Sequence, residues 1–91
     1  MVRRDLTEEQ IKADILNRLV NANAFGKYHI PCDQMRSWIE NKIKRNGKKV
    51  TKCTNELAKT GLIIKTARNT IYANHQKLDE ILTYIDHNLM E

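Results

Sequence analysis

Hydrophobic residues recur at helical spacing in the first quarter of the chain. Thr7 and Gln10, three residues apart, form a capping-box pattern, which predicts that a helix begins near Glu8. The helical spacing then continues to about Asn23. The apolar positions of this first predicted helix are Ile11, Ile15, Leu16, Leu19 and Val20.

A break and a second helix follow. Gly26 and the Ile30-Pro31 pair disfavour helix and predict a short extended piece over Tyr28–Ile30. Asp33 is then in position to cap a second helix, and Arg45-Asn46-Gly47 predicts the turn that ends it. The apolar stripe of this second helix consists of Met35, Trp38, Ile39 and Ile43.

A third helix is predicted over about residues 49–60, followed by a β-hairpin over residues 62–73. The apolar positions of the helix are Val50, Cys53, Leu57 and Ala58, and Gly61 predicts its end. Two β-rich runs, 62–64 and 70–72, then flank a polar segment at 65–69.

Helical spacing returns over residues 74–91. We expect this fourth helix to mediate a homodimer, because its apolar stripe is long for a terminal helix on so small a core. The alternative is that the stripe covers the core of its own chain. The stripe consists of Leu78, Ile81, Leu82, Ile85 and Leu89.

Length and composition restrict the class of protein. Ninety-one residues with 41% hydrophobic residues fit a single domain, 1–91, with one core. The longest apolar run is far shorter than a membrane helix requires, so a cytoplasmic protein without a membrane or secretion signal is expected. A disulfide framework is not expected from two cysteines, which stay as thiols in a reducing compartment. A zinc site is not expected either, because paired ligand spacing is missing among the four residues that would have to form it. Those residues are His29, Cys32, Cys53 and His75.

The positive charge is concentrated in the middle of the chain. Residues 27–68 hold eleven basic side chains against three acidic ones, a net charge of +8, whereas the whole chain has a net charge of +5. The segments on either side, 1–26 and 69–91, have net charges of zero and −3. Such segregation is typical of proteins that bind a polyanion, although a basic face that only promotes solubility has the same composition.

The order of the predicted elements, helix, strand, helix, helix, strand, strand, helix, resembles that of the winged helix-turn-helix family. The segment Leu57-Ala58-Lys59-Thr60-Gly61-Leu62-Ile63 is similar to the end of that family's third helix and the start of its wing. The resemblance implies a mostly α fold with a small β-hairpin, an α+β class. It also implies double-stranded DNA as the partner, bound by a transcriptional regulator or an architectural protein.

Two groups of polar residues are the candidate DNA contacts. On the third helix, Lys and Asn side chains gather opposite the apolar positions and are suited to base edges and phosphates. At the hairpin tip, Arg68 is the main candidate for phosphate or minor-groove contact. The helix group is Lys48, Lys49, Thr51, Lys52, Asn55 and Lys59, and the wing group is Lys65, Thr66, Arg68 and Asn69.

Other functions are weighed against this one. A fold of this kind also serves as a protein-interaction module, and structured RNA is a third possible partner. Trp38 and Tyr72 are expected in the core, since 5% aromatic residues leave few rings for stacking on single strands. No catalytic activity, cofactor or small-molecule substrate is expected, because no nucleophile with an orienting acid and no phosphate-binding loop is present.

Overall fold

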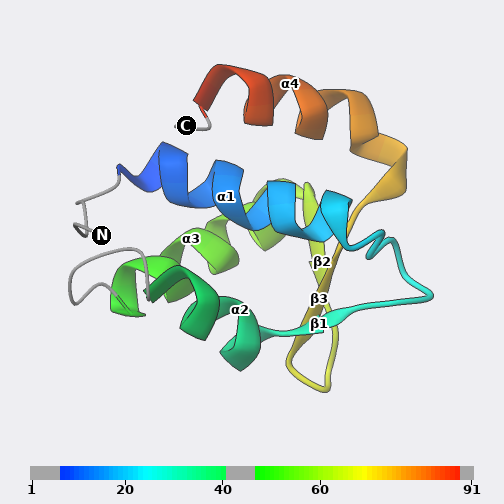
Figure 1. Ribbon diagram of the computed structural model, residues 1–91. Coiled ribbons are helices and arrows are strands. Elements are labelled where there is room, and N and C mark those ends of the chain that lie inside the picture. The colour runs from blue at the N-terminus through cyan, green and yellow to red at the C-terminus, as the bar shows by residue number, and fades with distance from the viewer. Residues whose placement is uncertain (1–6, 41–46, 89–91) are drawn as a thin grey trace.

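The computed structural model describes residues 7–40 and 47–88 (Figure 1). In these residues four helices and a small antiparallel sheet of three strands form a mostly helical α+β fold, the class expected from the sequence. The elements in chain order are α1 (Glu8–Asn21), β1 (Ile30–Pro31), α2 (Cys32–Glu40), α3 (Gly47–Thr60), β2 (Ile63–Lys65), β3 (Thr70–Ala73), a 3₁₀ turn η1 (His75–Lys77) and α4 (Leu78–Asn88).

Helix α1 begins as predicted. The Thr7 hydroxyl accepts a hydrogen bond from the Gln10 backbone N–H at 3.1 Å, and the Gln10 side chain accepts one from the Thr7 N–H at 2.9 Å. The helix ends at Asn21, two residues earlier than predicted, because Asn23 adopts a left-handed conformation with φ 58°. The Asn23 and Ala24 N–H groups then bond back to Val20 and Leu19, which closes the helix end.

The start of α2 differs from the prediction. The extended segment is Ile30–Pro31 rather than Tyr28–Ile30, and α2 follows it directly at Cys32. Asp33 therefore lies in the first helical turn and is not the cap. The Cys32 N–H instead donates to the Asn69 carbonyl of the hairpin turn at 2.9 Å, so a backbone group from a distant segment binds this helix end.

Helix α3 also begins earlier than expected. Gly47, predicted as part of a turn, is its first residue, whereas Ile43, Arg45 and Asn46 lie outside the described residues. The predicted stop is confirmed: Gly61 has φ +84°, and the Leu62 N–H bonds back to the Leu57 carbonyl at 3.2 Å.

Strand β3 is the central strand of the sheet, in the order β1-β3-β2. Ile30 of β1 pairs with Ile71, and Ile64 of β2 pairs with Tyr72. Ile71 and Ala73 are buried, while Tyr72 between them is partly exposed, as the alternation of side chains along a strand requires.

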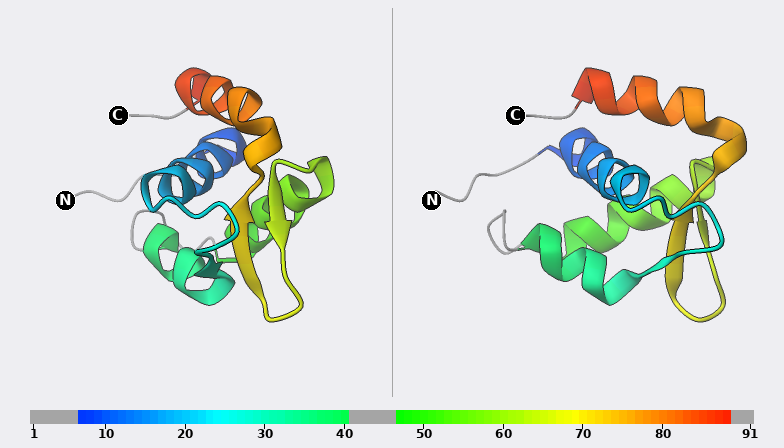
Figure 2. Two further views of the ribbon diagram at one scale, coloured as in Figure 1. Left: turned by 90° about the vertical axis from the view of Figure 1, so that its right-hand side faces the viewer. Right: turned by 45° about the vertical axis from the view of Figure 1, so that its right-hand side comes forward.

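Helix α1 is the centre of the packing. Figure 2 shows α4 on one side of α1, with α2 and α3 on the other, and the hairpin extending beyond the helices. The predicted core positions of α1 are fully buried except Val20, which is partly buried and packs against the core. Met35 and Ile39 of α2 are buried in the same core, and Trp38 packs at its edge.

Candidate functional site

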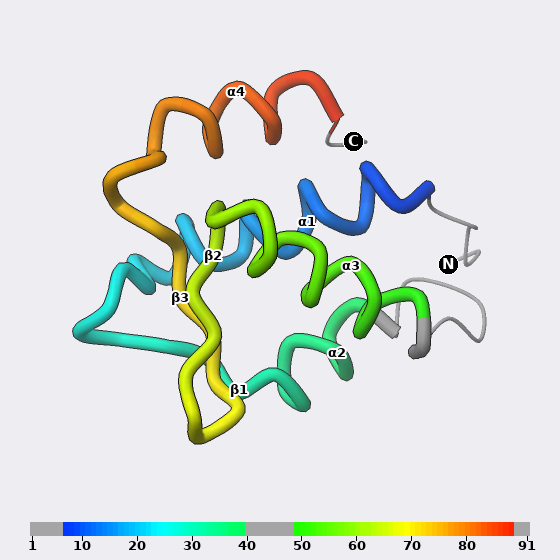
Figure 3. Tube along the Cα trace, turned by 180° about the vertical axis from the view of Figure 1, so that it is seen from behind, coloured from blue at the N-terminus to red at the C-terminus, as the bar shows by residue number. Residues whose placement is uncertain are grey.

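One face of α3 is packed and the opposite face is exposed (Figure 3). The packed residues predicted from spacing, Val50, Cys53 and Leu57, are at most 2% exposed. Thr54 is also buried, which its polar character did not predict, and its hydroxyl donates to the Val50 carbonyl at 2.9 Å. Four exposed polar side chains form what we call the α3 row: Thr51, Lys52, Asn55 and Lys59.

Two further lysines, Lys48 and Lys49, were predicted for this face. Lys49 is partly buried and lies four residues before the buried Cys53, so it is on the packed side of the helix rather than on the exposed face. The side chain of Lys48 lies outside what the structure describes. The described part of the α3 row therefore has two ammonium groups, from Lys52 and Lys59.

Four charged side chains link α3 to α1. Lys52 Nζ lies 3.1 Å from Glu8 Oε2, and Lys12 Nζ lies 2.7 Å from Glu56 Oε1. The hydrogen bond from Lys12 lowers the pKa of Glu56 and raises that of Lys12, and the hydrogen bond to Glu8 raises the pKa of Lys52. We call Glu8, Lys12, Lys52 and Glu56 the charge quartet. The quartet combines two acidic with two basic side chains, so its formal charges cancel.

The surface along the α3 row is slightly hollowed. A shallow depression of about 410 Å³ is lined by the α3 row together with Glu56. A donor amide, two ammonium groups, a hydroxyl and a carboxylate thus share one open surface, which is too shallow to enclose a small molecule.

The hairpin tip is a compact turn over residues 66–69. The Asn69 N–H donates to the Thr66 carbonyl at 3.1 Å, and Asn69 has φ 61°. The Thr66 hydroxyl lies 2.6 Å from that of Thr70 and accepts from the Arg68 N–H at 3.2 Å. Thr66 was predicted to contact DNA, but its hydroxyl is bonded within the turn and it is only partly exposed, so its role in this structure is to shape the tip.

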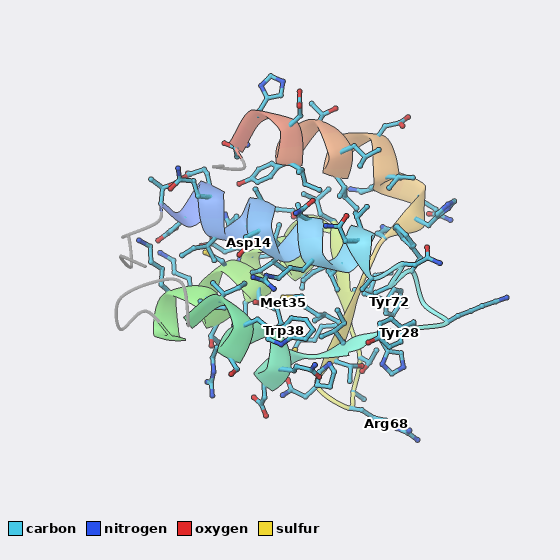
Figure 4. The ribbon with its side chains drawn as sticks, in the orientation of Figure 1. Asp14, Tyr28, Met35, Trp38, Arg68 and Tyr72 are labelled. Atoms are coloured by element: carbon cyan, nitrogen blue, oxygen red, sulfur yellow. The ribbon has the colours of Figure 1, made fainter. Side chains whose placement is uncertain are left out.

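The other wing residues are exposed. Lys65, Arg68 and Asn69 all lie on the surface, and the Arg68 side chain extends from the tip away from the body of the protein (Figure 4). The Asn69 carbonyl holds the first N–H of α2, so the tip is attached to the helical body rather than free. Arg68 is thus an exposed cation on a turn that is hydrogen-bonded to α2.

The apolar stripe of α4 is largely used within its own chain. Ile81 is 0% exposed and lies in the core, so its predicted place in a dimer interface is wrong. Leu78 and Ile85 are half-buried, and Leu89 lies outside the described residues. Among the members of the stripe that the structure describes, Leu82 is the most exposed, at 45%. The alternative reading, that α4 covers the core, accounts for most of the stripe.

The cysteines and histidines are not gathered. Cys53 is buried with its thiol 3.6 Å from the Glu8 carbonyl, whereas His75 makes an edge contact with Phe25 at 5.6 Å. Among residues 7–40 and 47–88 no three His, Cys, Asp or Glu side chains are placed to hold a metal ion. Both Cys32 and Cys53 are free thiols. Burial raises the pKa of the Cys53 thiol to about 11.

The predicted core aromatics are both partly buried. Trp38 packs against the core and has the Arg18 guanidinium 5.7 Å from its ring centroid, and Tyr72 packs on the core from the sheet. Neither ring lies fully open as a stacking platform.

Sequence reasoning missed Asn74, which joins three elements. Its side-chain amide donates to the Gly61 carbonyl at 2.8 Å, and its side-chain oxygen accepts from the Gln76 N–H at 3.1 Å. Its backbone N–H donates to the Leu62 carbonyl at 3.0 Å. An Asn just before an apolar helical run is a capping signal, so the second of these contacts could have been predicted; the first could not.

Comparison with protein-family models, curated proteins and solved structures gives no match to this chain. No helix in the described residues has the length and apolar character needed to span a bilayer.

Proposed function

We propose that this chain is a winged-helix module that binds double-stranded DNA, with α3 as its recognition helix and the β2–β3 hairpin as its wing. The observation that supports this most directly is the α3 row, a line of polar and cationic side chains on a helix whose opposite face is packed. A major groove about 12 Å wide accepts a helix presented in this way.

The order of elements supports the same proposal. A short strand precedes α2 and a hairpin follows α3, which is the order implied by the resemblance to winged-helix proteins. In the structure the short strand also pairs with the hairpin. Holding the hairpin against α2 keeps its tip at a fixed position relative to α3. Both contact surfaces would then meet one duplex in one orientation.

Within this proposal the exposed residues have different roles. The Asn55 amide has the donor and acceptor that pair with an adenine edge, so it reads sequence. Arg68 and Lys65 on the wing contact phosphates or the minor groove, so they position the protein without reading sequence. A transcriptional regulator and an architectural protein both fit this division of roles.

A salt titration of binding to a random-sequence duplex tests the proposal. Because binding releases counterions from neutralised phosphates, affinity should fall steeply and linearly on a log–log plot as salt rises. A protein-interaction module would show little affinity for the duplex at any salt concentration. Stronger binding to structured RNA of the same length would favour the RNA alternative.

Two substitutions separate reading from positioning. Asn55→Ala should reduce the preference for one sequence over others by about 1–3 kcal/mol, while Arg68→Ala should weaken binding to all duplexes and lower the salt slope by roughly one unit. If changing Lys52, Asn55 and Lys59 alters neither affinity nor preference in a folded protein, α3 is not the reading helix.

A protein-interaction module is the second candidate function. The charge quartet favours it, because Lys52 and Glu56 already have partners on α1 and the α3 surface is less basic than the sequence alone indicates. Retained fold with no duplex binding in the salt titration would make this the leading function.

We also propose that the module acts as a homodimer. Two copies would place two recognition helices on half-sites about one helical turn apart. Since Ile81 is committed to the core, the contact would centre on the exposed Leu82 instead of on the whole stripe.

A further inference from the structure

The charge quartet lies along the seam between α1 and α3. Each helix contributes one acid and one base four residues apart: Glu8 and Lys12 from α1, Lys52 and Glu56 from α3. Charges of opposite sign are therefore neighbours both along each helix and across the seam. The two cross-seam contacts, at 3.1 and 2.7 Å, fix which base each acid neutralises.

The two ion pairs differ in how accessible their lysines are. The Lys12 side chain is 20% exposed and lies in the seam, whereas the Lys52 side chain is 58% exposed and belongs to the α3 row. Lys52 is thus the member of the quartet that both faces a prospective phosphate and is already bound to a carboxylate. An exposed ion pair of this kind contributes little stability because water and salt screen it, so another anion can compete for the lysine.

We infer that Glu8 competes with DNA phosphate for Lys52 and so limits the affinity of the protein for duplex DNA. This inference rests on the proposed function. A phosphate that binds Lys52 weakens or replaces its contact with the Glu8 carboxylate, and this loss reduces what Lys52 contributes to binding. A phosphate from any sequence does this equally well, so Glu8 lowers affinity for all duplexes and leaves sequence preference unchanged.

The test is the affinity of Glu8→Gln for a random-sequence duplex, measured by fluorescence anisotropy at constant salt. Gln keeps the length of the side chain but removes its charge, and an exposed ion pair of this type corresponds to a gain of about two- to fivefold. Glu9→Gln is the matched control. Glu9 is the next residue in the same first turn of α1 and is exposed, so its substitution removes the same charge from the same helix end.

The same two substitutions in a Lys52→Gln background complete the experiment. In that background Glu8→Gln and Glu9→Gln should change duplex affinity by the same factor, because the Lys52 ammonium group for which Glu8 and phosphate compete is absent. Far-UV circular dichroism of each variant shows whether its helices are intact, and the unchanged Glu8 backbone keeps its contact with Cys53.

The outcomes distinguish the inference from the proposed function. If the unsubstituted protein binds no duplex, the proposed function fails and this inference fails with it. If that protein binds duplex but Glu8→Gln and Glu9→Gln raise affinity equally, only the inference is overturned. A larger gain for Glu8→Gln that survives in the Lys52→Gln background would also overturn it, because the gain would not act through Lys52.

Discussion

Replacing Asn74 with Ala should destabilise the fold by about 2 kcal/mol. The substitution removes the hydrogen bond to the Gly61 carbonyl at 2.8 Å and the one from the Gln76 N–H at 3.1 Å. A hydrogen bond of this kind contributes about 1 kcal/mol net, and loss of a helix cap costs a similar amount. For a domain of this size the loss corresponds to a fall in Tm of roughly 8–16 °C.

Asn74→Asp separates the contributions of the two hydrogen bonds. Aspartate keeps an oxygen to accept from the Gln76 N–H, but it has no donor for the Gly61 carbonyl and would place a second oxygen near it, so at least half of the loss should remain. Urea unfolding followed by circular dichroism measures both variants. Asn55→Ala is the control, because Asn55 is exposed in α3 and Ala favours helix there.

A cost below about 0.5 kcal/mol for Asn74→Ala, similar to that of an ordinary surface substitution, would refute this reasoning. It would mean that the backbone bond from Asn74 to Leu62, which the substitution leaves in place, is enough to hold α3, the hairpin and α4 together.

Three further predictions address the helix stop, the buried thiol and the dimer. Gly61→Ala should cost about 1–2 kcal/mol in urea unfolding, because φ +84° is unfavourable for Ala and the added carbon would also meet Lys77 Nζ at 3.3 Å; a neutral result would contradict the left-handed stop. The Cys53 thiol keeps its proton to about pH 11 in the folded state but loses it near pH 9.0 when unfolded, so the free energy of unfolding should fall as pH rises between these values. Cys53→Ala should show a shallower fall, and identical pH profiles would rule out a contribution from this thiol. Leu82→Glu should convert a homodimer to a folded monomer in sedimentation experiments, and a monomeric unsubstituted protein at high micromolar concentration would remove the dimer altogether.

Periodicity predicted the helices because burial on one face leaves a regular trace in the sequence. Val50, Cys53 and Leu57 are buried as their spacing indicates, and Gly61 ends α3 as its conformational freedom allows. Element boundaries were less predictable where a tertiary contact sets them. Asp33 had the correct chemistry for a cap, but the pairing of β1 with β3 brings the Asn69 carbonyl to the Cys32 N–H and starts the helix at Cys32, two residues before the Gln34 start that an Asp33 cap implies.

The sequence predicted which α3 residues share an exposed face, but not which residues of other elements contact them. Spacing placed Lys52, Asn55 and Lys59 on one exposed side of α3, and the structure agrees. That Lys52 has Glu8 as a partner could not be predicted, because the two residues are 44 positions apart and meet only once α1 packs on α3. The burial of Ile81 likewise depends on which side of α4 meets α1, and the stripe alone does not decide this.

The attachment of the hairpin to α2 determines where the chain tolerates extra residues. Two features must be preserved: the Thr66–Thr70 contacts that close the loop and the Asn69 carbonyl bonded to Cys32. An insertion between Ala67 and Arg68 lengthens the exposed tip and leaves both features in place, although it gives up the turn bonds that Thr66 accepts from the Asn69 and Arg68 N–H groups. An insertion between Asn69 and Thr70 separates the Asn69 carbonyl from strand β3, which positions it. The first amide of α2, that of Cys32, then loses its acceptor. The wing can therefore be extended or carry a grafted peptide on one side of Arg68 but not on the other.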